Sequence, residues 1–314
     1  MRYLIFGTGA IGGYFGGRLL QHGHQVNFIA RGKQLAAINK NGLKLNSLKG
    51  DIHLPKGSGS HSIKSELLYD GMFIAVKSTQ LAQAAADIIK KCSPHTVVVP
   101  LLNGVDIEQK LIAYGLKPQQ IINAFANIIC KVSDYGVIEH SGGEPHITLG
   151  VRAGFHNDSE LTHINFVIEQ IAHDFKVAQV NVSIKTDITD ALWAKYLFVA
   201  PWAAISSLVE QPLGAIRANK SCLTLLHYLI DEYQLIATAQ GANVSERVIE
   251  NIKKGLELLP PASKTSMQHD VEQQRANEFD TLIESAYTLS KKYALNTPIL
   301  NTCYGCLLVK LGSN

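Results

Sequence analysis

Three glycines near the start of the chain have the spacing of a dinucleotide-binding loop. Gly7, Gly9 and Gly12 follow the pattern G-x-G-x-x-G, after a short apolar run at 3–6 and at the head of a helical pattern over 10–21. In such a loop the first glycine permits a tight turn, the second lets the backbone approach a pyrophosphate, and the third lets the helix pack on the strand.

The helix that follows the loop would direct its N-terminus toward the phosphates. The predicted cofactor contacts in this segment are Gly7, Gly9, Ala10, Ile11 and Gly12. A glycine turn that binds no ligand is the alternative interpretation. A second apolar run at 25–30 follows at the distance expected of a βαβ unit, which favours the cofactor.

The end of that second run indicates which cofactor would bind. A carboxylate at this place usually accepts a hydrogen bond from the ribose 2′-hydroxyl of NAD, but this chain has Arg31 and Lys33 and no carboxylate. A guanidinium matches the geometry of a phosphate. The sequence therefore predicts NADP(H), with Arg31 on the 2′-phosphate. The alternative is that both cations are ordinary solvated charges at the start of a helix.

A single lysine lies in an apolar segment of the second half of the chain. Lys195 is flanked by Trp193, Tyr196 and Leu197. Burial lowers the pKa of a lysine, which suits it to donate a proton near neutral pH. Reduction of a ketone requires such a proton on the new alkoxide oxygen. The alternative is a lysine that extends its ammonium out of a core helix into solvent.

Three further polar residues are candidates on weaker local grounds. Glu278 could bind a substrate hydroxyl or orient the lysine, although its neighbours alone favour a solvated helix charge. Asn103 follows a buried strand and is either a turn residue or a contact near the nicotinamide. Lys77 ends the apolar run at 72–76, on the side where ligands bind in parallel sheets.

The composition excludes several classes of function. The chain has 314 residues with 46% hydrophobic and 18% charged residues, and its net charge of +3 is too small to indicate nucleic-acid binding. Segment 191–209 approaches the length of a membrane span but contains Lys195 and Pro201, which favours a buried core helix. The five cysteines form no disulfide or zinc pattern. We expect a cytoplasmic protein with no membrane, nucleic-acid or metal partner.

Hydrophobic periodicity divides the chain into two domains. Residues 1–183 alternate strands and helices, which predicts an α/β domain with a doubly wound Rossmann-type sheet and antiparallel additions at one edge. The strands are expected at 3–6, 25–30, 42–45, 51–54, 72–76, 96–102, 121–126, 147–149 and 177–182. Residues 184–314 show only helical periodicity and predict an all-helical substrate domain, with helix breaks near Pro201, Pro212, Gly241, Pro260 and Pro298.

These elements together resemble the ketopantoate reductase (2-dehydropantoate 2-reductase) family over nearly the whole chain. The resemblance lies in the ordered segments IFGTGAIGG at 5–13, ARG at 30–32, VK at 76–77, LNGV at 102–105, LWAK at 192–195, PLGAIRA at 212–218, and KTSMQHD through EFD at 264–280. It implies NADPH-dependent reduction of 2-dehydropantoate to pantoate in pantothenate biosynthesis, and a helical domain similar to that of 6-phosphogluconate dehydrogenase.

The resemblance also implies roles for individual residues. Lys195 would be the general acid, Glu278 would bind the substrate hydroxyl, and Ser266 would contact the substrate carboxylate. Lys77 and Asn103 would line the side of the nicotinamide and the substrate, and Arg31 would bind the 2′-phosphate.

Three positions depart from the family pattern. Val199 and Ala203 stand where members of the family carry asparagines, four and eight residues after the lysine, and Ser263 stands where an asparagine is common. Loss of these amides weakens binding of a hydroxy acid.

We expect Ser266, Val199 and Ser263 to contact a 2-oxo acid, which is ketopantoate or a more apolar 2-oxo acid or ketone. A non-catalytic NADP-binding sensor is a third reading. The chain would act as a monomer or homodimer.

Overall fold

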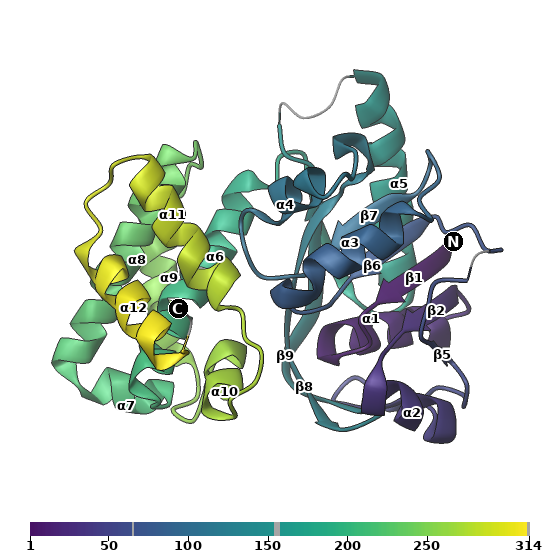
Figure 1. Cartoon of the computed structure of the whole chain (residues 1–314), viewed down its shortest axis with the longest axis horizontal. Coiled ribbons are helices and arrows are strands. Elements are labelled where there is room, and N and C mark those ends of the chain that lie inside the picture. The colour runs from purple at the N-terminus through teal and green to yellow at the C-terminus, as the bar shows by residue number, and fades with distance from the viewer. Residues whose placement is uncertain (65, 154–157, 313–314) are drawn as a thin grey trace. The chain divides into compact units, whose positions relative to one another are not determined.

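The computed structural model describes residues 1–64, 66–153 and 158–312, and contacts divide the chain into two compact units. The α/β unit comprises 1–76, 80–102 and 107–188. The helical unit comprises the chain from 189 onward together with two short segments of the first half, 77–79 and 103–106. Figure 1 shows strands and helices in the α/β unit and helices in the other.

The α/β unit contains a parallel sheet that carries the glycine loop. Its strand order is β5-β2-β1-β6-β7. The strands are β1 (Arg2–Phe6), β2 (Gln25–Ile29), β5 (Gly59–Ser60), β6 (Gly71–Ile74) and β7 (Val97–Pro100). The order reverses at β1, because the chain runs first to β2 on one side and later to β6 on the other. Such a switch point is where ligands bind in open parallel sheets.

Helices connect these strands as expected of right-handed crossovers. They are α1 (Ala10–Gln21), α2 (Gly32–Asn41), α3 (Leu81–Ile89), α4 (Ile107–Ala113) and α5 (Asp158–Val177), with 3₁₀ turns at Ser78–Gln80 and Pro118–Gln120. In Figure 1, α3 lies over the strands β6 and β7. Apolar side chains from both faces of the sheet form two hydrophobic clusters, which explains why β1, β6 and β7 are apolar almost throughout.

A second sheet corrects the expected antiparallel additions to the edge of the first. The additional strands form a separate mixed sheet of order β10-β9-β3-β4, with β8 paired antiparallel to β9. They are β3 (Lys44–Ser47), β4 (Ile52–His53), β8 (Asn123–Asp134), β9 (Val137–Gly150) and β10 (Asn181–Lys185). Strands β8 and β9 are longer than predicted, because the exposed outer part of β8 and the polar, glycine-containing middle of β9 lack the continuous apolar run of a buried strand.

Helix α1 packs against both sheets through its glycines. An added Cβ at Gly16 would lie 2.6 Å from the Ile5 and Phe28 side chains of the first sheet, and one at Gly13 would lie 2.1 Å from Ile138 of the second. The repeated glycine pairs of the segment therefore serve close packing on two faces. This packing holds the N-terminus of α1 at the end of β1.

The helical unit is built around one long apolar helix. Its helices are α6 (Thr189–Val209), α7 (Leu213–Ala218), α8 (Lys220–Ala239), α9 (Glu246–Leu258), α10 (Ser266–Glu272), α11 (Ser285–Lys292) and α12 (Pro298–Lys310), with a π-turn at Asp280–Glu284. Helix α6 contacts α8, α9, α10, α12 and the π-turn. The break predicted at Pro201 is wrong, because α6 continues through that residue.

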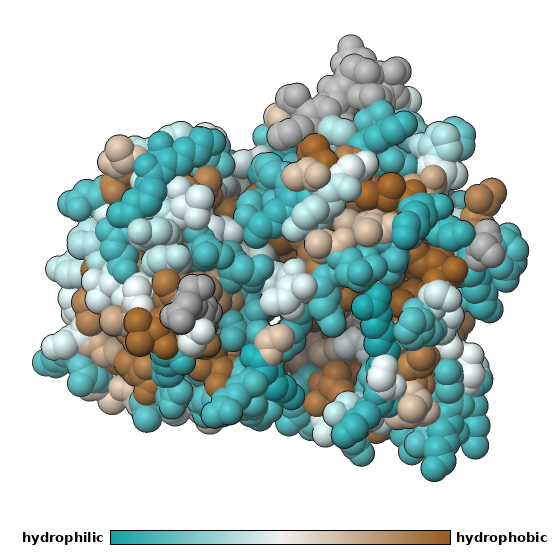
Figure 2. Space-filling view, viewed as in Figure 1, coloured by the Kyte–Doolittle hydropathy of each residue, from teal (hydrophilic) through white to brown (hydrophobic). Residues whose placement is uncertain are grey.

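Helix α6 is the one helix in the described residues that is long and apolar enough to cross a membrane, and 67% of its apolar window is buried inside the protein. This agrees with the prediction of a core helix. Figure 2 shows hydrophilic residues over most of the visible face, with smaller apolar clusters among them. The predicted fold class, a Rossmann-type α/β part followed by an all-helical part, is confirmed.

Candidate functional site

The glycine loop has the backbone conformation that its spacing predicts. Gly7 has a φ of +104°, and a Cβ there would lie 2.6 Å from the carbonyl oxygen of Ala75. A Cβ at Gly12 would lie 2.0 Å from the Gly7 oxygen. The same test at Gly9 meets no atom within 4 Å, so the space beside this residue is open to a ligand.

The loop is held so that amides at the start of α1 are available. The amides of Gly7 and Thr8 both donate to the Ile29 carbonyl, at 3.1 Å. Gly9 is the N-cap of α1, and no side chain caps this helix. The first amides of a helix lack intrahelical acceptors, and the helix dipole favours an anion there. Residues Gly9, Ala10 and Ile11 therefore fit a pyrophosphate.

Arg31 lines a cavity of about 360 Å³ in the α/β unit. Its guanidinium lies 3.3 Å from the Asp87 carboxylate of α3 and 6.0 Å from the centre of the Phe6 ring, and its side chain is 45% exposed. The remaining lining residues are His61, Ser62, Ile63, Gln83, Lys90 and Lys91. The cavity thus combines an arginine, two lysines and an aromatic ring at the carboxyl ends of β1 and β2, which suits a phosphorylated nucleoside.

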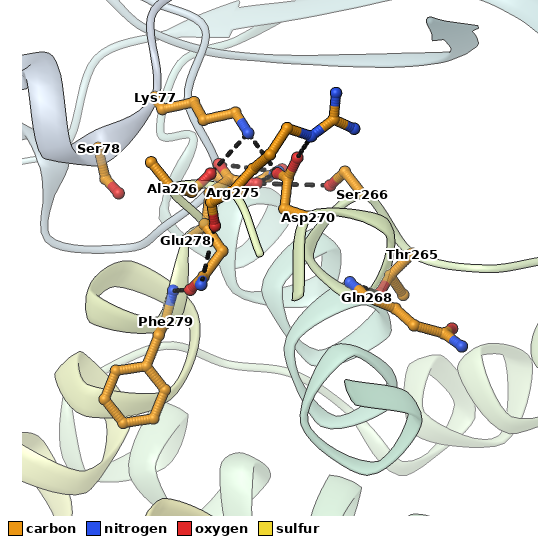
Figure 3. Close-up of polar contacts among 12 residues, drawn as sticks. Lys77, Ser78, Thr265, Ser266, Gln268, Asp270, Arg275, Ala276, Glu278 and Phe279 are labelled. Carbon is orange, nitrogen blue, oxygen red and sulfur yellow. Dashed lines mark hydrogen bonds and ion pairs between the residues drawn. The ribbon is translucent and has the colours of Figure 1, made fainter. Parts of the chain in front are cut away.

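Figure 3 shows the polar cluster of the helical unit, in which Lys77 is the central cation. Its ammonium donates to the Asp270 carboxylate and, at 2.7 Å, to the Ala276 carbonyl. Arg275 lies 3.4 Å from the other oxygen of Asp270. Asp270 is thus shared by two cations, and the position of Lys77 is fixed from the helical unit rather than by its own strand.

Glu278 lies beside this cation cluster and is 9% exposed. The amide of Asn103 lies 3.2 Å from Oε2 of Glu278, and the Ser266 hydroxyl lies 3.4 Å from the same oxygen. Burial raises the pKa of the Glu278 carboxyl, while the Asn103 hydrogen bond and the Lys77 charge act in the opposite direction. Local structure helps to place Ser266, because the Thr265 hydroxyl caps α10 by accepting from the Gln268 amide.

Lys195 occupies the second turn of α6 and is partly buried. Burial lowers the pKa of its ammonium to about 8. Such a group is protonated at neutral pH and gives up its proton more readily than an ordinary lysine, as a general acid must. Its neighbour Tyr196 is buried and bonded to the segment that follows Glu278, at the carbonyls of Thr281 and Leu282.

The three positions that depart from the family pattern have different environments. Val199 follows Lys195 by one turn of α6 and is partly buried against the helical core. Ala203, one turn further, is fully buried in that core. The hydrogen bonds described for Ser263 are those of its backbone, to Pro260 and Leu213.

The structure therefore brings together Lys77, Asn103, Ser266 and Glu278, which are separated by up to 201 residues in the sequence. Sequence reasoning missed Asp270 and Arg275, which hold Lys77, and Asp87, which pairs with Arg31. Asp270 lies in the segment that carries the resemblance, so its acidic side chain was a usable signal. Asp87 on the polar face of α3 has no distinguishing local pattern.

Among the described residues, no group of three or more His, Cys, Asp or Glu could hold a metal.

Two family sequence models match the chain. One, described as "Ketopantoate reductase PanE/ApbA", matches residues 3–154, and the other, described as "Ketopantoate reductase PanE/ApbA C terminal", matches residues 187–310. The chain belongs to the ketopantoate reductase family. It is therefore an oxidoreductase of a family that uses a nicotinamide cofactor to reduce 2-oxo acids. Family membership therefore favours an enzyme over the non-catalytic NADP-binding sensor.

Individual relatives are distant but match over their full length. The chain is 27% identical to "Uncharacterized oxidoreductase YkpB" of Bacillus subtilis, covering 98% of each chain. A crystal structure of a PanE/ApbA family ketopantoate reductase from Ralstonia eutropha superposes with a TM-score of 0.87 at 23% identity, covering 99% of each chain. A structure of D-mandelate dehydrogenase with NADH and anilino(oxo)acetate superposes with a TM-score of 0.86 at 19% identity, covering 100% of this chain and 99% of the other. These structures share the fold.

Proposed function

We propose that this protein is an NADPH-dependent reductase of a 2-oxo acid, and that 2-dehydropantoate is the substrate its family membership favours. The observation that carries the proposal is that one helical unit contains both Lys195, whose ammonium has a pKa lowered by burial to about 8, and the buried carboxylate of Glu278. One group can donate a proton and the other can accept a hydrogen bond from a substrate hydroxyl.

In this proposal the α/β unit, within residues 1–183, holds the cofactor. The open space at Gly9 and the amides at the start of α1 receive the pyrophosphate, and Arg31 with the lysine-lined cavity receives the adenosine 2′-phosphate. When bound, the cofactor supplies the hydride that reduces the carbonyl carbon.

The helical domain, residues 184–314, supplies the remaining chemistry together with two loop residues of the first half. Lys195 donates a proton to the carbonyl oxygen as that oxygen gains negative charge. Glu278 accepts from the substrate hydroxyl and is itself oriented by Asn103. Lys77 and Ser266 offer an ammonium and a hydroxyl to the substrate carboxylate.

A reductase of a more apolar 2-oxo acid is the second candidate. The observation in its favour is that Val199, one helical turn after Lys195, offers a methyl surface where the family pattern has an amide. A hydroxylated substrate gains no hydrogen bond from that surface, whereas an aliphatic or aromatic side chain packs on it.

A panel of 2-oxo acids tests both candidates. The purified chain is mixed with NADPH and, in turn, 2-dehydropantoate, 2-oxoisovalerate and phenylglyoxylate, and loss of NADPH absorbance is followed. The proposal expects turnover of at least one acid, with the highest kcat/KM identifying the candidate. Repeating the best reaction with NADH tests the cofactor preference. Absence of turnover with every acid and both cofactors would refute the function. Light scattering on the same sample distinguishes monomer from homodimer.

A further inference from the structure

A π-turn begins two residues after Glu278. The helix that begins after this residue is wound as a π-helix over Asp280–Glu284 before it continues as α11. A π-turn contains one residue more than an α-turn, and one residue corresponds to about 100° of rotation about a helix axis. The angular position of Glu278 relative to α11 therefore depends on whether the segment is wound as a π-turn or as a regular α-turn.

Three consecutive carbonyls of the π-turn accept hydrogen bonds from hydroxyl groups. The Ser285 hydroxyl lies 2.8 Å from the Asp280 carbonyl oxygen and 2.7 Å from the Asp106 carboxylate, between which its one proton is shared. The Tyr196 hydroxyl lies 2.9 Å from the carbonyl oxygens of both Thr281 and Leu282. The Tyr233 hydroxyl donates to the Leu282 oxygen at 2.8 Å. Thr281 and Leu282 are fully buried, so water cannot replace these donors.

The two tyrosines come from helices that form the core of the unit. Tyr196 lies on α6 and is 3% exposed, Tyr233 lies on α8 and is fully buried, and their ring centres are 5.5 Å apart. Burial raises the pKa of both hydroxyls, which keeps them protonated as donors. A π-turn leaves carbonyls without regular helical partners, and a buried carbonyl without a donor is unfavourable. The tyrosines therefore favour the π-turn over a regular α-helix.

We propose that Tyr196 and Tyr233 are positioning residues that hold the π-turn and thereby fix the carboxylate of Glu278. Tyr196 directly follows Lys195, so the same helix that carries the ammonium also donates to the segment that carries the carboxylate. The inference rests on the proposed function in one respect, the role of Glu278 toward the substrate. The hydrogen bonds to the π-turn do not depend on that function.

The variants Tyr196→Phe, Tyr233→Phe and the double variant remove the hydroxyls and retain the rings. Ser290→Ala is the matched control, because the Ser290 hydroxyl is also buried and donates to a carbonyl of α11, that of Tyr287 at 2.8 Å, outside the π-turn. Thermal unfolding of all variants measures the common cost of losing a buried hydrogen bond.

The first measurement requires no enzymatic activity. Carbon-13 labelling of glutamate carboxyls, with Glu278→Gln for assignment, gives the pKa of Glu278 by NMR titration. We expect this pKa to fall toward that of an exposed glutamate in the double variant and to stay at the parent value in Ser290→Ala, because a relaxed turn moves the carboxylate out of its buried position. An unchanged pKa in the double variant would overturn the proposal.

The second measurement is steady-state kinetics with the best 2-oxo acid. We expect kcat/KM to fall by about 10- to 100-fold in the double variant, the scale of a small misplacement of a positioned group, with NADPH affinity unchanged. Kinetics equal to those of Ser290→Ala would assign the tyrosines to stability alone and overturn their positioning role. If the parent protein itself reduced no acid, the proposed function would fail while the titration still decided whether the tyrosines position Glu278.

Discussion

The glycine loop and the polar cluster around Glu278 are assembled in opposite ways. The loop is one continuous segment, 7–12, and its geometry follows from strand, turn and helix in that order. The polar cluster uses side chains at 77, 103, 266, 270 and 278, which come from loops and helices in two distant parts of the chain. The proposed phosphate site is thus encoded locally, whereas the proposed substrate site depends on tertiary structure.

This difference determines which changes each region tolerates. We expect the loop to tolerate changes of side chain as long as Gly7 and Gly12 keep their close backbone contacts, because backbone amides would contact a bound phosphate. The polar cluster is built almost entirely from side-chain atoms, the Ala276 carbonyl that accepts from Lys77 being the exception. Substitutions in the cluster should therefore change catalysis strongly and cofactor binding little, and substitutions near Arg31 should do the reverse.

The largest expected effect is that of Lys195→Ala. Loss of a positioned proton donor should lower kcat by about 10²–10⁴-fold, with the affinity for NADPH retained. Lys254→Ala on α9 is a matched control, because Lys254 is 70% exposed and pairs only with Glu250 four residues earlier in the described contacts. Steady-state kinetics and fluorescence titration of NADPH make the comparison. Turnover at the parent rate in Lys195→Ala would refute its role as the acid.

The pH dependence gives a second measure of the same residue. The Lys195 pKa of about 8 predicts that kcat falls as the pH rises above 8, when the ammonium loses its proton. The unfolded chain keeps this proton to higher pH, so the lysine's contribution to stability becomes more favourable as the pH rises from about 8 toward the ordinary pKa of lysine. Lys195→Ala should therefore unfold at a temperature equal to or above that of the parent at pH 7.

The same contrast explains which features of the two regions could be predicted from the sequence. Gly7, Gly9, Gly12 and the helical nature of the second half could be predicted because spacing and periodicity are local. The hydroxyl donors Tyr196 and Tyr233 could not, since each looks like an ordinary core residue until the helices pack. Asp270 lies in the matched segment, but nothing local indicates that two cations share its carboxylate. The roles of Lys195 and Glu278 rested on their local sequence together with the family resemblance and stay predictions.

Glu278→Ala should have the next largest effect. Loss of a buried, charge-assisted contact with a substrate hydroxyl lowers kcat/KM by about 10- to 100-fold, since such bonds contribute about 1.5–3 kcal/mol. NADPH affinity should stay within about twofold, because this carboxylate belongs to the helical unit. Glu272→Ala, which removes a carboxylate paired with Lys264 in the same unit, is the control. A substrate without a hydroxyl should be affected less, and equal losses for both substrates would contradict the proposed contact.

Arg31→Ala tests the α/β unit. It should reduce the preference for NADPH over NADH by about 5- to 30-fold, or about 1–2 kcal/mol for a charge-assisted bond at a half-exposed arginine. The turnover number at saturating cofactor should change little. Arg247→Ala, at an exposed arginine of the helical unit, controls for the loss of one positive charge. Calorimetric titration with both cofactors measures the preference, and equal affinities in the parent protein would show that Arg31 does not select NADPH.

Val199→Asn should produce a smaller and more selective change. A new amide one turn after Lys195 should raise kcat/KM for 2-dehydropantoate by about 2- to 10-fold relative to 2-oxoisovalerate, the effect of one added hydrogen bond. Ala203→Asn is the informative comparison, because it places the same amide in the fully buried core and should lower the unfolding temperature without selective gain. An unchanged substrate ratio in Val199→Asn would show that this side chain lies away from the substrate.

The smallest expected effect concerns the carboxylate that pairs with Arg31. Asp87 lies 3.3 Å from the guanidinium, is held by Gln83 at 3.1 Å, and lines the same cavity. A 2′-phosphate that binds Arg31 must compete with this partner and accept its repulsion. Half-exposed ion pairs contribute about 0.2–1 kcal/mol, so Asp87→Asn should tighten NADPH binding by about two- to fivefold and leave NADH binding unchanged. The gain should shrink at high salt, because screening weakens the repulsion that the substitution removes.

Glu169→Gln on α5 removes the same charge from an exposed site outside the cavity and should change neither affinity. If Asp87→Asn weakened NADPH binding, the carboxylate would instead help to orient Arg31 for the phosphate, and the two residues would form one binding unit rather than a competing pair.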